Sequence, residues 1–153
     1  KAIDLNPNYA DAHSNLGLVL RDLGILKEAE LFSRKAIELN PEIANAHLNL
    51  GIILRDLGNL HQAEISFRKA IKINPNFAMF HSNLGGILKD LGKLKEAESS
   101  CLKAIEINPD FAEAYSNLGI ILKDLGKVNE AKLFTQNIFP DNFNPHIIID
   151  RTT

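Results

Sequence analysis

Four asparagines recur at an interval of 34 residues, and their side chains are the groups in this chain best suited to bind a ligand. An amide offers a hydrogen-bond donor and an acceptor together, so a row of amides can bind the backbone of an extended peptide whatever its sequence. Alternatively, each amide bonds a neighbouring helix and fixes the register between repeats, and the two roles are compatible. We call these residues the Asn row: Asn15, Asn49, Asn83 and Asn117.

A basic residue and an acidic residue follow each asparagine at a constant distance. The basic residue falls in the last turn of a predicted helix, where the helix dipole favours a cation. The acidic residue opposes that dipole, so we expect it to form ion pairs with the basic row of a neighbouring repeat, with contact to a basic ligand as the alternative. These residues complete the predicted peptide-binding surface: Arg21, Asp22, Arg55, Asp56, Lys89, Asp90, Lys123 and Asp124.

Three histidines and one cysteine could hold a metal or act as nucleophiles, but their positions favour packing. His13, His47 and His81 stand where an aromatic side chain would pack, and neighbouring helices lie about 8–10 Å apart. Cys101 takes an aromatic position in its repeat, and nothing near it in the sequence would stabilise a thiolate. We therefore predict no metal site and no cofactor.

Composition and motifs argue against several classes of function. The chain shows no Ser-His-Asp order with its supporting elements, no phosphate-binding loop and no HExxH motif, so it is predicted not to be an enzyme. A formal net charge of −2 makes nucleic acid and anionic membranes poor partners. No apolar run is long enough to cross a bilayer, and a single cysteine favours a reducing, cytoplasmic location.

The elements that must position these residues recur with the same period. Prolines 7, 41, 75 and 109 set an interval of 34, which indicates a helical repeat protein. In each unit a first helix, helix A, has its inward-facing residues at steps of three and four, which in the first unit are Ala10, His13, Leu16, Gly17 and Leu20. A second helix, helix B, runs from Lys27 to about Leu39 in the first unit. Glycines expected in the left-handed conformation end each helix A: Gly24, Gly58, Gly92 and Gly126.

Further glycines lie inside helix A, where each costs about 1 kcal/mol relative to Ala. We expect close packing against the first alanine of helix B to compensate. The facing rows are Gly17, Gly51, Gly85 and Gly119 on helix A and Ala29, Ala63, Ala97 and Ala131 on helix B.

The combined spacing resembles the tetratricopeptide repeat (TPR) family. In the first unit the matching residues are His13, Leu16, Gly17, Leu20, Ala29, Ala36 and Pro41. The resemblance implies an all-α, right-handed superhelical solenoid of antiparallel helix pairs. The Asn row also resembles that of the TPR superhelix of O-linked N-acetylglucosamine transferase, which implies binding of an extended peptide in a concave groove.

The predicted organisation is a remnant of a preceding repeat at 1–9, then repeats at 10–43, 44–77, 78–111 and 112–139, then an irregular tail at 140–153. Pro140 is expected to cut the last helix B short. We predict a non-catalytic scaffold whose partner is a protein or an extended peptide. Two alternatives stay open: a substrate-recruiting arm of a larger enzyme such as a glycosyltransferase, and weak self-assembly through the open ends of the array, with Ile147 to Ile149 contributing.

Overall fold

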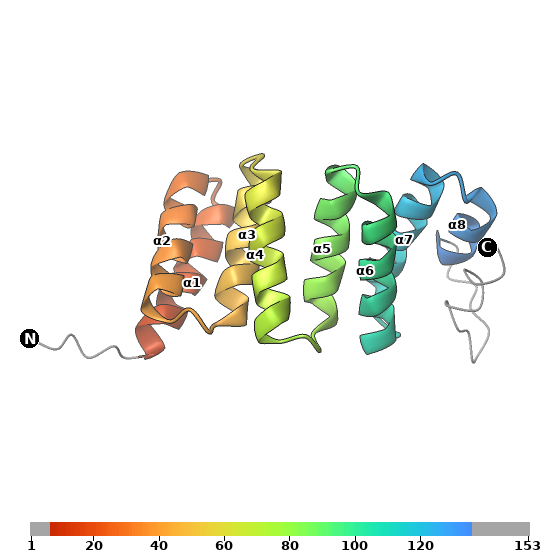
Figure 1. The fold of residues 1–153 in the computed structure, drawn as a ribbon. Coiled ribbons are helices and arrows are strands. Elements are labelled where there is room, and N and C mark those ends of the chain that lie inside the picture. The colour runs from red at the N-terminus through yellow and green to blue at the C-terminus, as the bar shows by residue number, and fades with distance from the viewer. Residues whose placement is uncertain (1–6, 136–153) are drawn as a thin grey trace, which may run out of the picture. The chain divides into compact units, whose positions relative to one another are not determined.

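The computed structural model describes residues 7–135 and contains eight helices in that range (Figure 1). Helices with odd numbers are the predicted helices A, and those with even numbers are helices B. Their bounds are α1 (Pro7–Asp22), α2 (Leu26–Leu39), α3 (Ala44–Asp56), α4 (Leu60–Ile73), α5 (Ala78–Asp90), α6 (Leu94–Ile107), α7 (Ala112–Asp124) and α8 (Val128–Thr135). None of these helices is long and apolar enough to cross a membrane.

Each helix A ends in the same glycine turn. In the first repeat the backbone N–H of Ile25 donates to the carbonyl of Leu20 at 2.8 Å, and that of Gly24 donates to Arg21 at 2.8 Å. This pair of bonds closes the last turn, and it requires a positive φ that glycine adopts without steric cost. Gly24 and its three equivalents have φ between 75° and 80°, which confirms the predicted stops.

Helices B end at an asparagine that precedes a proline. Asn40 has φ −148° and ψ 99°, and its backbone N–H still donates to the carbonyl of Ala36. The extended conformation is the one that a following proline imposes on its neighbour. Asn74 and Asn108 end α4 and α6 in the same way.

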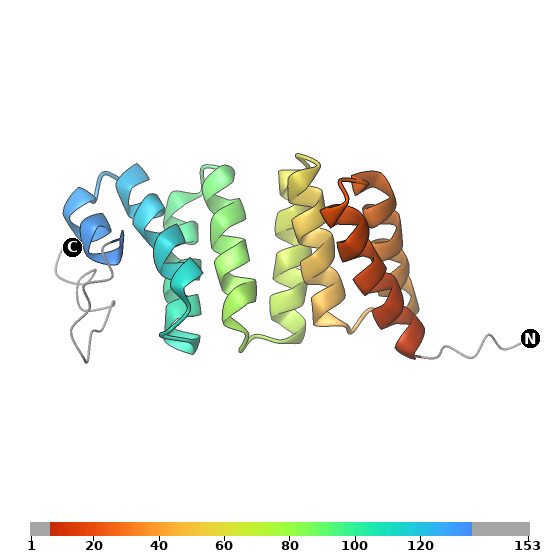
Figure 2. The same cartoon turned by 180° about the vertical axis from the view of Figure 1, so that it is seen from behind.

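The described helices form two compact units, one up to Pro75 and one from Asn76. In the first unit α1 packs against α2, α3 against α4 and α2 against α3, while α1 also lies beside α3. The second unit repeats this pattern with α5 to α8. Figures 1 and 2 show that within each unit the two helices A occupy one face and the two helices B the other. The prediction of an all-α array of helix pairs is confirmed.

Small residues allow the helices of one pair to approach closely. A Cβ added to Gly85 would lie 2.5 Å from Sγ of Cys101 and 3.3 Å from the carbonyl oxygen of Ala97. A Cβ at Gly17 would meet the hydroxyl of Ser33 in the same manner. Gly17 and Gly85 therefore face the residue one turn after the alanine, together with the alanine's backbone. The expected close packing against the alanine row is seen at Ala29 and Ala97, and the side chain one turn later lies closer still.

One expected core residue of the first helix lies at the surface. Leu16 is exposed, whereas Leu50 and Leu118, at the same position of α3 and α7, are buried. In each unit the second helix A, which carries one of these buried leucines, contacts both helices of the preceding pair. No described helix pair precedes α1, where Leu16 is 39% exposed.

The segment predicted as a remnant lies mostly outside the described residues, although α1 begins at Pro7 and includes its last three positions. Pro140, the predicted end of the last helix B and the tail also lie outside them.

Candidate peptide-binding surface

Within each unit the Asn row brings two asparagines to the face formed by helices A. Asn15 on α1 and Asn49 on α3 belong to the first unit, and Asn83 on α5 and Asn117 on α7 belong to the second. Because α1 lies beside α3, and α5 beside α7, residues at the same position of the repeat on these two helices A are neighbours.

The second asparagine of each unit bonds the preceding helix A. Nδ2 of Asn49 donates to Oγ of Ser14 at 2.8 Å, and both side chains are buried. Nδ2 of Asn117 donates to Oγ of Ser82 at 3.1 Å. These two bonds are equivalent in the two units, and they are of the kind that the register-fixing alternative predicts. Sequence reasoning did not single out the two serines.

The first asparagine of each unit behaves differently. Asn15 is exposed. Asn83 is buried, and its amide donates to the carbonyl oxygen of Met79, four residues earlier on the same helix, at 2.9 Å. Of the four amides, that of Asn15 is therefore the most accessible to a ligand.

The predicted ion pair between repeats forms in the first unit. Nε of Arg21 lies 2.6 Å from Oδ2 of Asp56, and both side chains are about 30% exposed. Arg21 also lies 3.5 Å from the carboxylate of Asp22, which is largely exposed. The expectation of a cross-repeat pair is confirmed here.

In the second unit the equivalent pair is not seen, and the expectation is wrong there. Nζ of Lys89 lies 2.9 Å from Asp90, its neighbour on α5, and Asp124 stays exposed on α7. The planar guanidinium of arginine can bond two carboxylates at once, whereas a lysine ammonium is a compact point charge. Arg55 and Lys123 form no ion pair with described residues of their own unit. The charges of Lys123 and Asp124 are thus open to a partner.

The histidine side chains pack against neighbouring residues and do not cluster at one site. The ring of His13 stacks on Phe32 with centroids 5.6 Å apart. His47 is buried, with Nε2 2.8 Å from the carbonyl oxygen of Pro41. Tyr115 holds the same position in the fourth repeat and stacks on Phe134. Across residues 7–135, no group of three potential ligands could hold a metal ion.

Cys101 is fully buried on α6, as the packing interpretation requires. Burial raises the pKa of its thiol to about 12, and the carboxylate of Glu113 contributes to the rise. A thiol with such a pKa is almost entirely protonated near neutral pH, so it is a poor nucleophile.

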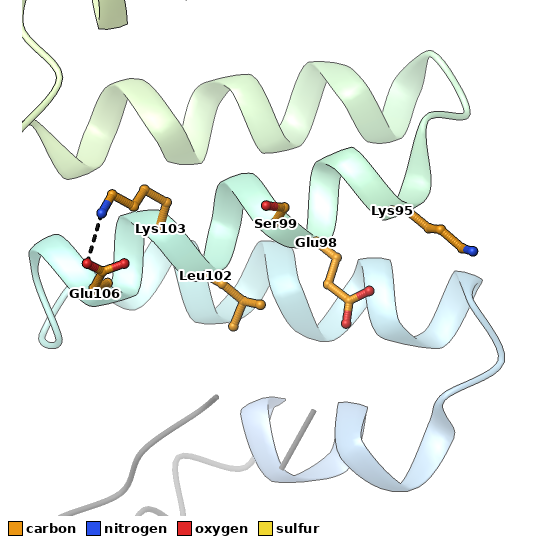
Figure 3. A pocket seen from close by; sticks show the side chains of 6 residues that line it. All are labelled: Lys95, Glu98, Ser99, Leu102, Lys103 and Glu106. Atoms are coloured by element: carbon orange, nitrogen blue, oxygen red, sulfur yellow. Dashed lines mark hydrogen bonds and ion pairs between the residues drawn. The ribbon is translucent and has the colours of Figure 1, made fainter. Parts of the chain in front are cut away.

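A groove of about 330 Å³ runs along α6 on the helix B side (Figure 3). Its rim carries two lysines and two glutamates, and all of them except Lys95 form ion pairs with described residues. Lys103 pairs with Glu106 at 2.8 Å, as the dashed line in Figure 3 marks, and Glu98 pairs with Lys127 at 3.0 Å. Nothing in this groove favours a ligand of one charge.

Comparison with known families decides the class of the protein. Models described as tetratricopeptide repeat match residues 10–43, 44–77, 78–111 and 100–132. The chain belongs to the tetratricopeptide repeat family. This TPR protein has no match among curated protein sequences.

Solved structures share the fold. PilF of Pseudomonas aeruginosa is 28% identical with a TM-score of 0.77, over 83% of this chain and 58% of its own. YrrB, described as a TPR protein with an unusual peptide-binding site, is 28% identical with a TM-score of 0.72, over 88% and 69%. The O-GlcNAc transferase of Thermobaculum terrenum is 25% identical with a TM-score of 0.71, over 75% and 22%. The TPR chain thus spans only part of PilF and a small part of the transferase.

Proposed function

We propose that this TPR chain is a non-catalytic binding module that holds an extended segment of another protein on the helix A face. The observation that carries the proposal is the juxtaposition of polar and apolar groups on α7. Ile120 is 45% exposed, and it lies one turn from the Asn117 amide and one turn from the free Asp124 carboxylate. An exposed aliphatic side chain beside amides and charges is typical of a protein-binding surface.

The family supports the same function. TPR domains commonly bind proteins and peptides, and YrrB is described by its peptide-binding site. In the described part of this chain, neither the histidines nor the cysteine form a group suited to catalysis. The proposal therefore assigns no reaction to these residues.

The Asn row provides the test. Decapeptides selected from a random library against the whole chain would be titrated into the parent and into Asn117→Ala. We expect the variant to bind about tenfold more weakly, because a hydrogen bond to the peptide backbone is lost. Asn129→Ala, an exposed asparagine on α8, is the matched control. Equal affinity of Asn117→Ala and the parent would refute the role of the Asn row.

A substrate-recruiting arm of a larger enzyme is the second candidate. The observation that favours it is the fold shared with the Thermobaculum terrenum transferase at 25% identity. This candidate uses the same surface, so the peptide titration tests the binding step of both. The sequence of the parent gene on either side of this segment separates them, because the second candidate requires a catalytic domain there.

Self-assembly is favoured by a separate surface, the outer face of α1. Tyr9, Val19 and Leu23 are each more than half exposed and, with Leu16, form one apolar stripe. In both units the equivalent face of the second helix A is covered by a preceding helix pair. Sedimentation of the parent and of Val19→Glu/Leu23→Glu over a range of concentrations tests the candidate: association that is lost in the variant supports it, and a strict monomer in both rules it out.

A further inference from the structure

An apolar cavity opens beside the Asn row in the second unit. Its volume is about 330 Å³, within the range of small ligand sites. Phe77 and Met79 line it from the start of α5, and Ile107 and Phe111 line it from the end of α6 and the turn that follows. Asn76 and Asn108 form its polar edge.

The cavity is continuous with the proposed binding surface through Met79. This residue occupies the helix A face one turn before Asn83, whose amide donates to the Met79 carbonyl at 2.9 Å. A peptide that follows the Asn row across α5 and α7 therefore passes the mouth of the cavity. Phe77 is 42% exposed at that mouth, so a large apolar side chain remains available for contact.

The charges beside the cavity have one sign. Asp110 lies in the turn between two of the lining residues, and Glu113 lies two residues beyond Phe111 on α7. Both side chains are exposed, and neither carboxylate forms an ion pair with a described residue of this unit. Lys103, the last cation of α6 in the sequence, is paired with Glu106.

Resting on the proposed function, we infer that this cavity takes the anchoring side chain of the bound segment, and that the segment is basic and apolar. A bulky aliphatic or aromatic residue enters between Phe77 and Phe111, and a flanking Lys or Arg meets Asp110 or Glu113. The side-chain oxygen of Asn108 already accepts from the backbone N–H of Asp110. Its amide NH2 is therefore the end that can donate to a peptide carbonyl.

Met79 gives the test an unusually clean signal, because it is the only methionine of the chain. A sample labelled with 13C at the methionine methyl shows one resonance, located at the cavity. The probe is a short peptide with a Lys-Leu-Lys core between Gly-Ser spacers. Its comparators carry Lys-Ala-Lys, which removes the anchor, and Glu-Leu-Glu, which reverses the flanking charge.

We expect the Lys-Leu-Lys peptide to shift the Met79 methyl resonance saturably. Both comparators should bind at least about tenfold more weakly, since each lacks one of the two interactions. Asp110→Asn/Glu113→Gln should weaken binding of the lysine peptide and remove its dependence on salt. Glu130→Gln, a carboxylate on α8 away from the cavity, is the control variant.

The results of these titrations distinguish binding at the cavity from binding by the Asn row. A peptide whose affinity depends on Asn117 but which leaves the Met79 methyl unmoved would overturn the cavity and keep the proposed function. A saturable methyl shift that is unchanged in Asn117→Ala would support the cavity and overturn the Asn row. Equal binding of the Lys-Leu-Lys and Glu-Leu-Glu peptides would overturn the basic character of the segment.

Discussion

The Asn49 amide donates a 2.8 Å hydrogen bond to the hydroxyl of Ser14, and this buried bond joins the two helices A of the first unit. An amide at this position of the repeat can thus serve the protein's own structure. Such a bond contributes to stability, and breaking it leaves the remaining partner buried without a hydrogen bond.

We expect Asn49→Ala to lower the free energy of unfolding by about 1–3 kcal/mol, because the Ser14 hydroxyl then loses its partner. Urea denaturation followed by circular dichroism measures the loss. Asn15→Ala, at the same position of α1 but exposed, should change stability by less than about 0.5 kcal/mol. Ser14→Ala in the Asn49→Ala background should cost little more, and a full additive loss would contradict the bond.

Two adjacent glycines on α5 are expected to respond to alanine in opposite directions. Gly85→Ala should destabilise the protein by about 1–3 kcal/mol, since the new Cβ would overlap Sγ of Cys101. Gly86→Ala should stabilise it by about 1 kcal/mol, because nothing lies within 4 Å of that Cβ and alanine favours the helix. Thermal melts of the two variants test the contrast, and a shift of the same sign in both would refute it.

Ser33 is a buried residue whose hydroxyl has no hydrogen-bond partner among the described residues. We expect Ser33→Ala to raise the free energy of unfolding by about 1 kcal/mol, because it removes an unsatisfied polar group from the core. Ser66→Ala is the control: the Ser66 hydroxyl already bonds the carbonyl of Gln62, so its removal should bring no such gain. A loss of stability in Ser33→Ala would show that the hydroxyl is bonded in solution.

We expect the buried thiol of Cys101 to make the free energy of unfolding fall in alkaline solution. Its pKa is raised to about 12 in the folded chain, whereas an exposed cysteine titrates near 8.5. Between these values the unfolded chain has released the proton and the folded chain has not. Over this pH range the Cys101 thiol should therefore lower the free energy of unfolding by about 1.4 kcal/mol per pH unit. The stabilisation that the protonated thiol provides is complete only below the pKa of the same thiol in the unfolded chain.

Urea unfolding of the parent and of Cys101→Ala between pH 8 and 10 isolates that contribution, because other titrating groups are common to both. The parent should lose more stability across this range than the variant. Reaction of the native parent with a thiol reagent at pH 8 should also be slow until urea unfolds it. Parallel pH profiles would mean that the thiol is accessible or its pKa ordinary.

The repeat period predicted the helix pairs and their glycine stops. Backbone geometry dictates these features, since only a few residue types fit a left-handed position or a residue that precedes proline. The outcome for the Asn row was harder to predict, because an amide bonds whichever polar group is nearest. Serine precedes asparagine at Ser14, Ser82 and Ser116 but not at Leu48, and this pattern was the available signal.

The ion pairs between the basic and acidic residues of helices A show a second limit of prediction from the sequence. Arg21 and Lys89 have the same place in the repeat, yet only Arg21 bonds the acid of the next helix A in its unit. Whether such a surface ion pair forms depends on the length and shape of the side chains, and the free-energy difference is only a fraction of a kcal/mol. The cavity beside Met79 was not predicted at all, since Phe77 and Phe111 precede their helices, where helical periodicity assigns no face.

The bonds from Asn49 to Ser14 and from Asn117 to Ser82 each close a loop of about one repeat. Within each unit the other contacts between helices join neighbours in the chain or helices one repeat apart. Such a low contact order keeps the entropy of loop closure small, so each unit can fold rapidly, in the microsecond to millisecond range typical of helical proteins. Nascent chain leaving the ribosome could therefore form the first unit as soon as its own four helices have emerged.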